Sequence, residues 1–278
     1  MADRKEILEM DPEEYSEFKR QEKDEVFEML SDATQKLVSG SYLRSYADMQ
    51  AKLLNHSVSN VLLIMEQMPE ATWVRTHDDW NKDNVMVLKG ETGIKALGPQ
   101  IYQREDGTIG KGSKVVKAFD VSQTNIKDLD IRRPSYRNVP DVIGLAYPAA
   151  VEADLPGGVD ALYDPKDVLI RYRHGLDPAA KLFAVAREHA VQFMMGDEVF
   201  SREEVIDRSE MAAYILTKHY GYEAPEIGFG EMSSKYPGKE ESEVRGQLGI
   251  IKHTAETIDS RVQEALALNR MDKQREER

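Results

Sequence analysis

The chain of 278 residues contains no cysteine and no long hydrophobic run. The lack of cysteine excludes disulfide scaffolds, cysteine-ligated zinc, iron–sulfur clusters and thiol catalysis. The longest strongly apolar stretch covers residues 61–65, which is far too short to span a bilayer. The first residues are charged and no apolar segment follows them, a pattern unlike a secretory signal. We therefore expect a cytoplasmic protein without a membrane partner.

Several catalytic motifs are also missing. The sequence has no Walker phosphate loop and no Gly-x-Ser-x-Gly nucleophile elbow. The glycine-rich segment 107–112 lacks the strand and helix that flank a phosphate loop, and it is more typical of a hairpin. The six histidines include no pair three or four residues apart, the spacing at which one helix face holds a metal ion.

Acidic residues are in excess, with 50 Asp and Glu against 37 Lys and Arg and a net charge of −13. Such a balance normally argues against a nucleic-acid partner. The charge is uneven, however: it is −7 over residues 1–35, +3 over 36–140 and −9 over 141–278. This distribution suggests two units with different roles.

The hydrophobic pattern predicts an α+β fold. Helical spacing covers residues 12–38, 42–54 and a segment ending at 68, and short β-branched stretches up to residue 120 then predict a small antiparallel sheet. Four of the eleven prolines lie in residues 126–160, which favours a connecting segment. The expected divisions are an acidic helical extension 1–35, a first domain 36–125, a linker 126–160, a mainly helical domain 161–270 and a charged tail 271–278.

The last long helix carries an apolar seam in which steps of four and three residues alternate from Val244 to Ala265. This heptad spacing suits either packing within the domain or a coiled-coil dimer. Because the seam is short and contains two alanines, we expect it to pack on its own domain. The oligomeric state stays open.

Polar and aromatic positions recur in a spaced order between residues 56 and 124. The order is Ser-x-x-Asn on a helix, Gln-x-Pro-x-Ala-Thr, a tryptophan, Lys-Gly-Glu and Phe-Asp-x-x-Gln-Thr. The positions are Ser57, Asn60, Gln67, Pro69, Ala71, Thr72, Trp80, Lys89, Gly90, Glu91, Phe119, Asp120, Gln123 and Thr124. This set closely resembles the first domain of ArdC-type antirestriction proteins of plasmids and other mobile elements. The resemblance covers roughly residues 40–125 and departs at His56, where a tyrosine is usual.

The resemblance implies binding of single-stranded DNA, for which a positive groove and aromatic stacking faces are needed. The candidate DNA-binding residues are Ser57, Asn60, Gln67, Arg75, Trp80, Lys89, Lys95, Lys111 and Lys114. Structural alternatives stay open for them. Asn60 and Gln67 share one helix face and could tie the helix to the sheet. Trp80 could lie in the core, and the lysines could form an ordinary solvated face.

Residues 163–223 resemble the zincin-like metallopeptidase domain of the same family. In that domain one helix carries His-Glu-x-x-His and the next supplies a glutamate ligand, so the resemblance implies a zinc-bound water polarised by the first glutamate. The aligned positions here are Arg187, Glu188, Val191 and Glu210. Valine has no donor atom and arginine is a permanent cation. We therefore expect a degenerate site with no catalytic residue, no metal and no cofactor.

Two further expectations concern this helix. His189 follows Glu188 and points about 100° away from it, so it cannot replace a lost ligand. We expect it at the surface or only partly hydrogen-bonded. Arg187 could replace the metal as the partner of Glu210, because a buried carboxylate without a cation is costly. Alternatively, a slight rotation of the helix would leave Arg187 in solvent.

These features predict a non-enzymatic protein that binds single-stranded DNA of a mobile element, with antirestriction as a role. The zincin-like domain could in addition bind a protein partner. Two alternatives stay open: an active zinc peptidase with unusual ligands, and an adaptor that binds a protein through the peptidase-like domain. DNA mimicry is disfavoured because the acidic residues do not form a long run.

Overall fold

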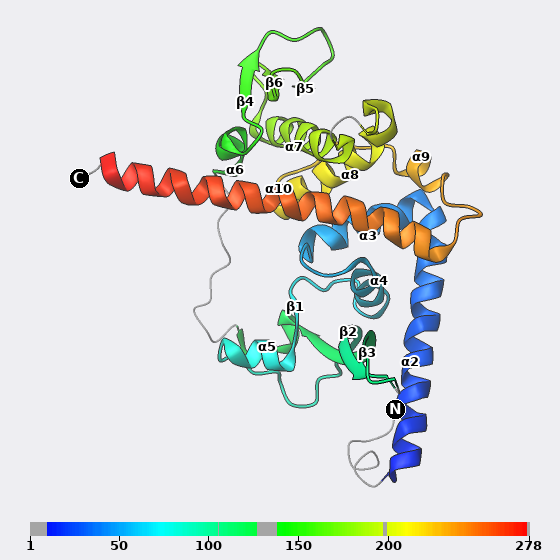
Figure 1. Ribbon diagram of the computed structural model, residues 1–278. Coiled ribbons are helices and arrows are strands. Elements are labelled where there is room, and N and C mark those ends of the chain that lie inside the picture. The colour runs from blue at the N-terminus through cyan, green and yellow to red at the C-terminus, as the bar shows by residue number, and fades with distance from the viewer. Residues whose placement is uncertain (1–9, 105, 127–137, 197–198, 277–278) are drawn as a thin grey trace. The chain divides into compact units, whose positions relative to one another are not determined.

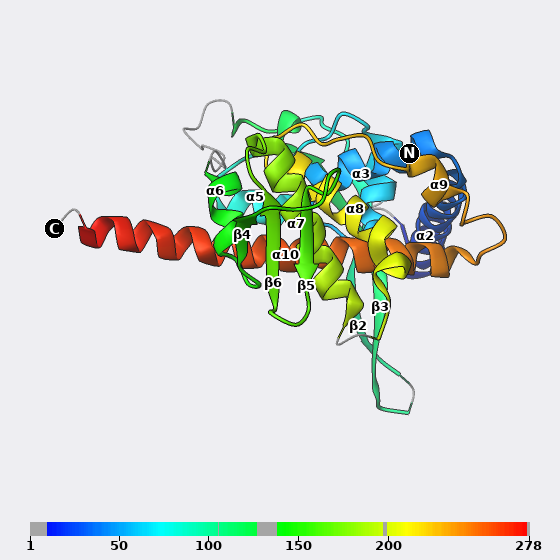
Figure 2. The ribbon, with the colours of Figure 1, turned by 90° about the horizontal axis from the view of Figure 1, so that it is seen from above.

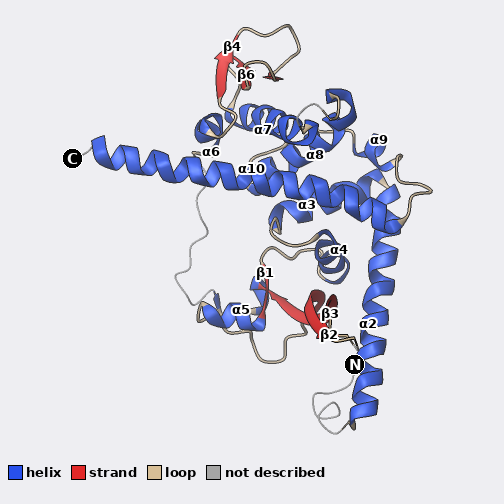
Figure 3. Ribbon diagram, in the orientation of Figure 1, coloured by secondary structure: helices blue, strands red, loops and turns tan. Residues whose placement is uncertain are grey.

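The computed structural model describes residues 10–104, 106–126, 138–196 and 199–276, with side chains up to residue 269. The chain divides into two compact units, each built from two segments. The first comprises Met1–Lys36 and Ser59–Ile131, and the second comprises Leu37–Val58 and Arg132–Arg278. Helices and two small sheets make up the fold, which confirms the predicted α+β class (Figure 3).

The first unit combines a long helix, two shorter helices and a three-stranded antiparallel sheet of order β1-β3-β2. Its elements are α2 (Pro12–Gln35), α4 (Val58–Gln67), β1 (Val74–Thr76), α5 (His77–Lys82), β2 (Ile94–Gln103), β3 (Ile109–Asp120) and the 3₁₀ turn η2 (Val121–Gln123). Helix α2 begins where expected, because Asp11 and Glu14 form a reciprocal capping box. One face of the sheet is buried, and its side chains are those of Val74, Ile94, Ala96 and Ala118.

Strands β2 and β3 form a long hairpin (Figure 2). Its outer half carries exposed residues on both faces, with Gly110 as a buried position. Ile101 and Ile109 there are 74% and 70% exposed. The glycine-rich segment is part of this hairpin, as predicted. The ring of Tyr102 lies against Gly110 and Gly112, and a Cβ at Gly110 would stand 2.6 Å from that ring. These glycines therefore make room for an aromatic side chain.

The second unit packs helices around α7 and α8 and carries a mixed sheet of order β4-β6-β5 (Figure 1). Its helical elements are η1 (Lys36–Val38, from Leu37 onward), α3 (Gly40–Lys52), α6 (Val139–Val142), η4 (Ile143–Leu145), α7 (Pro178–Met195), α8 (Arg202–His219), α9 (Phe229–Ser233) and α10 (Glu241–Glu276). Its strands are β4 (Ala150–Ala153), β5 (Ala161–Asp164) and β6 (Leu169–Arg173). Strand β6 runs parallel to β4 and antiparallel to β5.

The observed division differs from the predicted boundaries at two places. Helix α3, placed by sequence in the first domain, packs on α8 and α9 of the second unit. Gly40 approaches Gly230 so closely that a Cβ would stand 2.8 Å from the Gly230 Cα. The described part of the expected linker, residues 138–160, contains α6, η4 and β4 and belongs to the second unit. Residues 127–137 lie outside the described residues.

The seam of α10 is buried along its whole length from Val244 to Ala265. Helix α10 contacts α6, α7 and α8 through it. The expectation that the seam packs within its own domain is therefore confirmed. Across the described residues, no helix is both long and apolar enough to cross a membrane.

Candidate functional sites

Asn60 and Gln67 of α4 hold the free edge of β2. The Asn60 side chain donates to the Leu97 carbonyl at 3.0 Å and accepts from the Leu97 N–H at 2.8 Å. Gln67 makes the same pair of bonds with Lys95, both at 2.8 Å. The two amide side chains thus make the backbone hydrogen bonds that a neighbouring strand would make with β2. Of the two roles considered for these residues, the structure displays the tie between helix and sheet.

Trp80 lies in the core, which is one of the two positions considered for it and is not compatible with its prediction as a DNA-binding residue. It is 0% exposed, and its Nε1 donates to the Phe119 carbonyl at 2.9 Å. Trp73 packs edge-on against it with ring centroids 4.9 Å apart. A base has no access to a ring enclosed in this way. Arg75 covers Trp80 at 5.0 Å from the ring centroid and also pairs with Asp83, so its guanidinium is already engaged.

The predicted lysines do not share one face. Lys95 pairs with Glu25 of α2 at 2.7 Å and its side chain is largely covered. Lys111 and Lys114 are both exposed on β3, but they are three residues apart and therefore point to opposite faces of the strand. Lys89 is exposed in the turn after α5. Ser57 is exposed immediately before α4, in a segment that clusters with the second unit.

The Phe-Asp-x-x-Gln-Thr motif at the end of β3 organises loops. Asp120 accepts hydrogen bonds from the backbone N–H groups of Thr72, Trp73 and Ser122 at 2.7 to 2.9 Å. Burial acts to raise the pKa of Asp120, but these N–H donors outweigh it and the pKa is lowered. Gln123 donates to the Thr92 carbonyl at 2.9 Å and to Glu91 at 3.0 Å. The motif therefore fixes the backbone around the sheet.

A groove of about 650 Å³ lies between α2 and the β2–β3 hairpin, within the first unit. Sequence reasoning missed it, because residues 1–35 were read as an acidic extension. Its lining residues are Tyr15, Ser16, Lys19, Arg20, Lys23, Gln100, Ser113, Lys114, Val115 and Val116. The lining contains four cations and no carboxylate. We call this feature the α2–β3 groove.

Glu188 of α7 is enclosed by two guanidinium groups. Its side chain is 0% exposed, and Arg202 binds both carboxylate oxygens, at 2.6 and 2.7 Å. Arg187 binds one oxygen through Nε at 3.0 Å, and the Tyr163 N–H donates to the other at 2.9 Å. Bidentate, charge-assisted pairs of this kind are among the strong hydrogen-bonding arrangements of a carboxylate.

Arg187 does not form the expected ion pair with Glu210. The ion pair that the structure gives Arg187 is with Glu188, the residue next to it. Burial raises the pKa of Glu210, and the positive charge of Arg187 opposes that rise only in part. The sequence had no reason to single out Arg202, which opens α8 and supplies the stronger partner of Glu188. The alternative of a fully solvated Arg187 is also wrong, since its side chain is 18% exposed.

The same cluster closes the free edge of β5. Arg187 donates to the Ala161 carbonyl at 3.2 Å, while Glu188 accepts from the Tyr163 N–H. Residues two apart on a strand present their backbone groups to the same side. An extended peptide adds to a sheet through such unpaired edge groups. Here α7 already occupies them.

His189 is completely buried, so the expectation of a surface position is wrong and that of partial hydrogen bonding holds. Its Nε2 lies 3.4 Å from the Ile143 carbonyl. Its Nδ1 is buried and has no hydrogen-bond partner in the described part of the chain. Loss of water lowers the pKa of His189 to about 4, so the ring is neutral near pH 7.

The residues at the zincin-type positions do not fit a metal ion. Val191 is buried and offers no donor atom, and Arg187 places a cation where a ligand would stand. Both oxygens of Glu188 are held by arginines. Among the described residues, no group of three or more His, Asp or Glu side chains is arranged to hold a metal.

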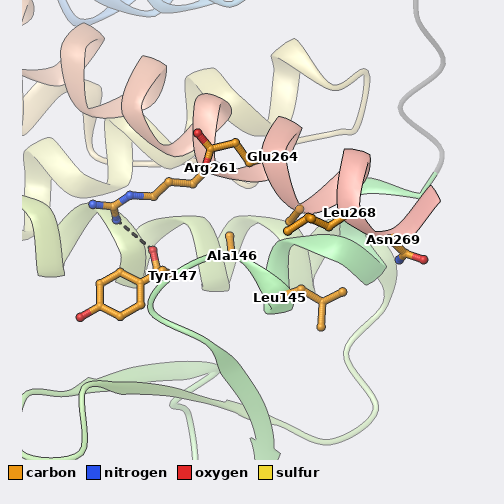
Figure 4. Close-up of a pocket in the computed structure, with 8 residues that line it drawn as sticks. Leu145, Ala146, Tyr147, Arg261, Glu264, Leu268 and Asn269 are labelled. Carbon is orange, nitrogen blue, oxygen red and sulfur yellow. Dashed lines mark hydrogen bonds between the residues drawn. The ribbon is translucent and has the colours of Figure 1, made fainter. Parts of the chain in front are cut away.

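A second hollow, of about 490 Å³, lies in the second unit between η4 and the end of α10 (Figure 4). Arg261 spans it and donates to the Tyr147 carbonyl at 3.0 Å and to Gln192 at 3.3 Å. Leu145 and Leu268 are exposed beside it. Arg261 and Glu264 are the two charged side chains among the residues that line this hollow.

Comparison with known proteins gives a likeness of structure alone. No sequence family matches the chain, and no curated protein sequence is significantly similar to it. The Mn(II)-bound structure of the antirestriction ArdC protein from R388 plasmid matches 84% of this chain and 98% of its own, with 13% identity and a TM-score of 0.52. Its metal-free structure matches 74% and 85%, with 13% identity and a TM-score of 0.48. The match to the Mn(II)-bound structure confirms, at the level of the fold, the resemblance drawn from the sequence.

Proposed function

We propose that this chain binds single-stranded DNA for a mobile genetic element, with an antirestriction role, and that its second unit does not hydrolyse peptides. The fold likeness to the ArdC antirestriction protein covers nearly the whole of that protein, which supports the biological setting. Fold alone does not define activity. The DNA-binding half is therefore supported by features of the first unit, and the non-peptidase half by features of the second.

The observation that carries the DNA-binding half is the exposed outer part of the β2–β3 hairpin. A two-stranded ribbon that buries neither face gains little stability from its own packing. Such ribbons recur as nucleic-acid-binding arms. This one presents Arg104 and Lys111 together with exposed Ile101 and Ile109, a combination of phosphate-binding cations and apolar side chains that can lie against bases.

The non-peptidase half rests on the Glu188 cluster. A zincin needs a glutamate free to polarise a metal-bound water, and Glu188 is instead neutralised by Arg187 and Arg202. The ArdC protein has been crystallised with Mn(II). The positions described above leave this chain without a matching set of donors, so no step of its function is assigned to a metal.

A titration of the full chain tests the proposal. A labelled single strand of mixed sequence and the matching duplex are titrated at low salt and followed by fluorescence anisotropy. We expect saturable binding of the single strand and weaker binding of the duplex. Absence of binding to either oligonucleotide would refute the DNA-binding half. Zinc-dependent cleavage of a denatured protein substrate, abolished by Glu188→Gln, would refute the other half.

A further inference from the structure

We infer that the α2–β3 groove is the path of the DNA strand, with Tyr15 stacking on a base and Lys19, Arg20, Lys23 and Lys114 binding phosphates. This inference rests on the proposed function and specifies where in the first unit the strand lies. The proposed contact lies on a helix of the acidic segment. The net charge of −7 over residues 1–35 makes this segment an unexpected place for DNA.

The charges of α2 are sorted by face. Between Pro12 and Gln35 the helix has eight acidic residues and three basic ones, and all three basic residues line the groove. Lys19 and Lys23 follow Tyr15 at steps of four, and Arg20 follows Ser16 in the same way. Steps of four bring side chains to one face of a helix. No acidic residue of α2 is part of the groove lining.

The opposite wall comes from the hairpin. Lys114 of β3 faces the groove, and Gln100 of β2 and Ser113 add neutral hydrogen-bonding groups. A strand lying in the groove would therefore meet cations from both walls. Lys19 and Arg20 are also paired with Glu22 and Glu17 at 2.8 and 2.9 Å. The Arg20–Glu17 pair is exposed and therefore weak in water, so a phosphate can compete for Arg20. Glu22 is largely buried, and a phosphate would share the exposed ammonium of Lys19 with it.

Tyr15 provides the stacking face that buried Trp80 cannot. It is 44% exposed, and the Lys19 ammonium lies 5.9 Å from its ring centroid. In a duplex the faces of the bases are covered by their neighbours, whereas a single strand can turn a base onto an aromatic ring. The groove therefore favours a single strand over a duplex.

The test compares two triple variants that each remove three positive charges. The groove variant is Lys19→Gln/Lys23→Gln/Lys114→Gln. The control is Lys52→Gln/Lys82→Gln/Lys166→Gln, at exposed lysines outside the groove lining. We expect the groove variant to weaken single-strand binding about tenfold or more at low salt, and its salt dependence to fall by about two units of slope. The control should stay within about twofold of the wild type, because its phosphate contacts are intact.

A second pair of variants tests the stacking. Tyr15→Ala should weaken single-strand binding by about tenfold, while Tyr15→Phe should keep most of the affinity because it retains the ring. Thermal unfolding of all variants confirms that they fold. Equal losses in the groove and control triples would overturn the groove while leaving single-strand binding by the chain intact. A wild-type chain that binds no oligonucleotide would overturn both, and duplex binding as tight as single-strand binding would refute the stacking of Tyr15.

Discussion

Arg202 at the start of α8 binds both carboxylate oxygens of Glu188 in the middle of α7, at 2.6 and 2.7 Å. The sequence resemblance aligns Glu188 with the general base of the zincin-like pattern, and in this structure the residue anchors two helices to each other. Arg187 and the Tyr163 N–H complete the shell. A buried carboxylate with all these partners is satisfied, but it depends on each of them.

Removing Arg202 should destabilise the second unit. In Arg202→Met the buried Glu188 carboxylate loses its bidentate partner, and we expect unfolding free energy to drop by about 3 kcal/mol in urea titrations. The double variant Glu188→Met/Arg202→Met should recover most of that loss, because no buried charge is left unpaired. Arg20→Met, which breaks an exposed pair with Glu17, serves as the control and should leave the unfolding free energy nearly unchanged. A loss in Arg202→Met no larger than in this control would contradict the role given to the pair.

Metal content provides a second prediction. The chain purified from medium containing zinc and manganese should carry neither metal in stoichiometric amount, and Glu210→Ala should leave the metal content unchanged. The reason is that Val191 and Arg187 occupy the ligand positions. Elemental analysis after gel filtration measures this directly. Stoichiometric zinc that disappears in Glu210→Ala would show that the site is functional after all.

His189 should make the second unit acid-sensitive. Its pKa falls from 6.5 to about 4 on folding, because burial disfavours the charged ring. Protonation therefore favours the unfolded chain: the full stability is present above pH 6.5 and is lost as the pH falls toward 4, by about 3 kcal/mol in the limit. Denaturant titrations across this range should show a shallower loss for His189→Leu than for the wild type. His174→Gln, at an exposed histidine, should follow the wild-type curve.

Asn60 should matter for stability and not for DNA affinity. Asn60→Ala leaves the Leu97 N–H and carbonyl on the β2 edge without their partner, which should cost about 1–3 kcal/mol of unfolding free energy. Single-strand affinity measured well below the unfolding temperature should change less than twofold. A large loss of affinity in a folded Asn60→Ala would instead restore the DNA-contact role first predicted for this residue.

The sequence positions that carry the resemblance turn out to be mainly those that hold the first unit together. Asn60 and Gln67 close an edge strand, Asp120 and Gln123 fix loops, and Trp80 fills the core. Such positions predict the fold well, because helix caps, hydrophobic periodicity and local hydrogen bonds depend on residues that are close together in the sequence. They say little about binding, which uses exposed residues with fewer constraints.

The groove and the Glu188 cluster could not be predicted for a physical reason. The groove depends on contacts between α2 and β3, which are far apart in sequence. The Glu188 cluster depends on how two consecutive helices pack, because this packing brings Arg202 at the start of α8 to Glu188 in the middle of α7. The one available signal was the placement of Lys19 and Lys23 on a single face of α2, which a net charge summed over the segment conceals. A buried position is one of the two that the sequence leaves open for Trp80, and no periodicity decides between them because α5 has only six residues.

The salt dependence of single-strand affinity tests the central claim most directly. Each phosphate neutralised on a single strand contributes about −0.7 to the slope of log affinity against log salt, so the four groove cations alone predict a slope of about −3, and phosphate contacts of Arg104 and Lys111 on the hairpin would make it steeper. Anisotropy titrations of the wild-type chain over a series of salt concentrations give this slope. A wild-type slope of about −3 or steeper that becomes shallower by about two units in Lys19→Gln/Lys23→Gln/Lys114→Gln is the result expected. Binding that is absent at low salt, or that does not respond to salt, would contradict the account.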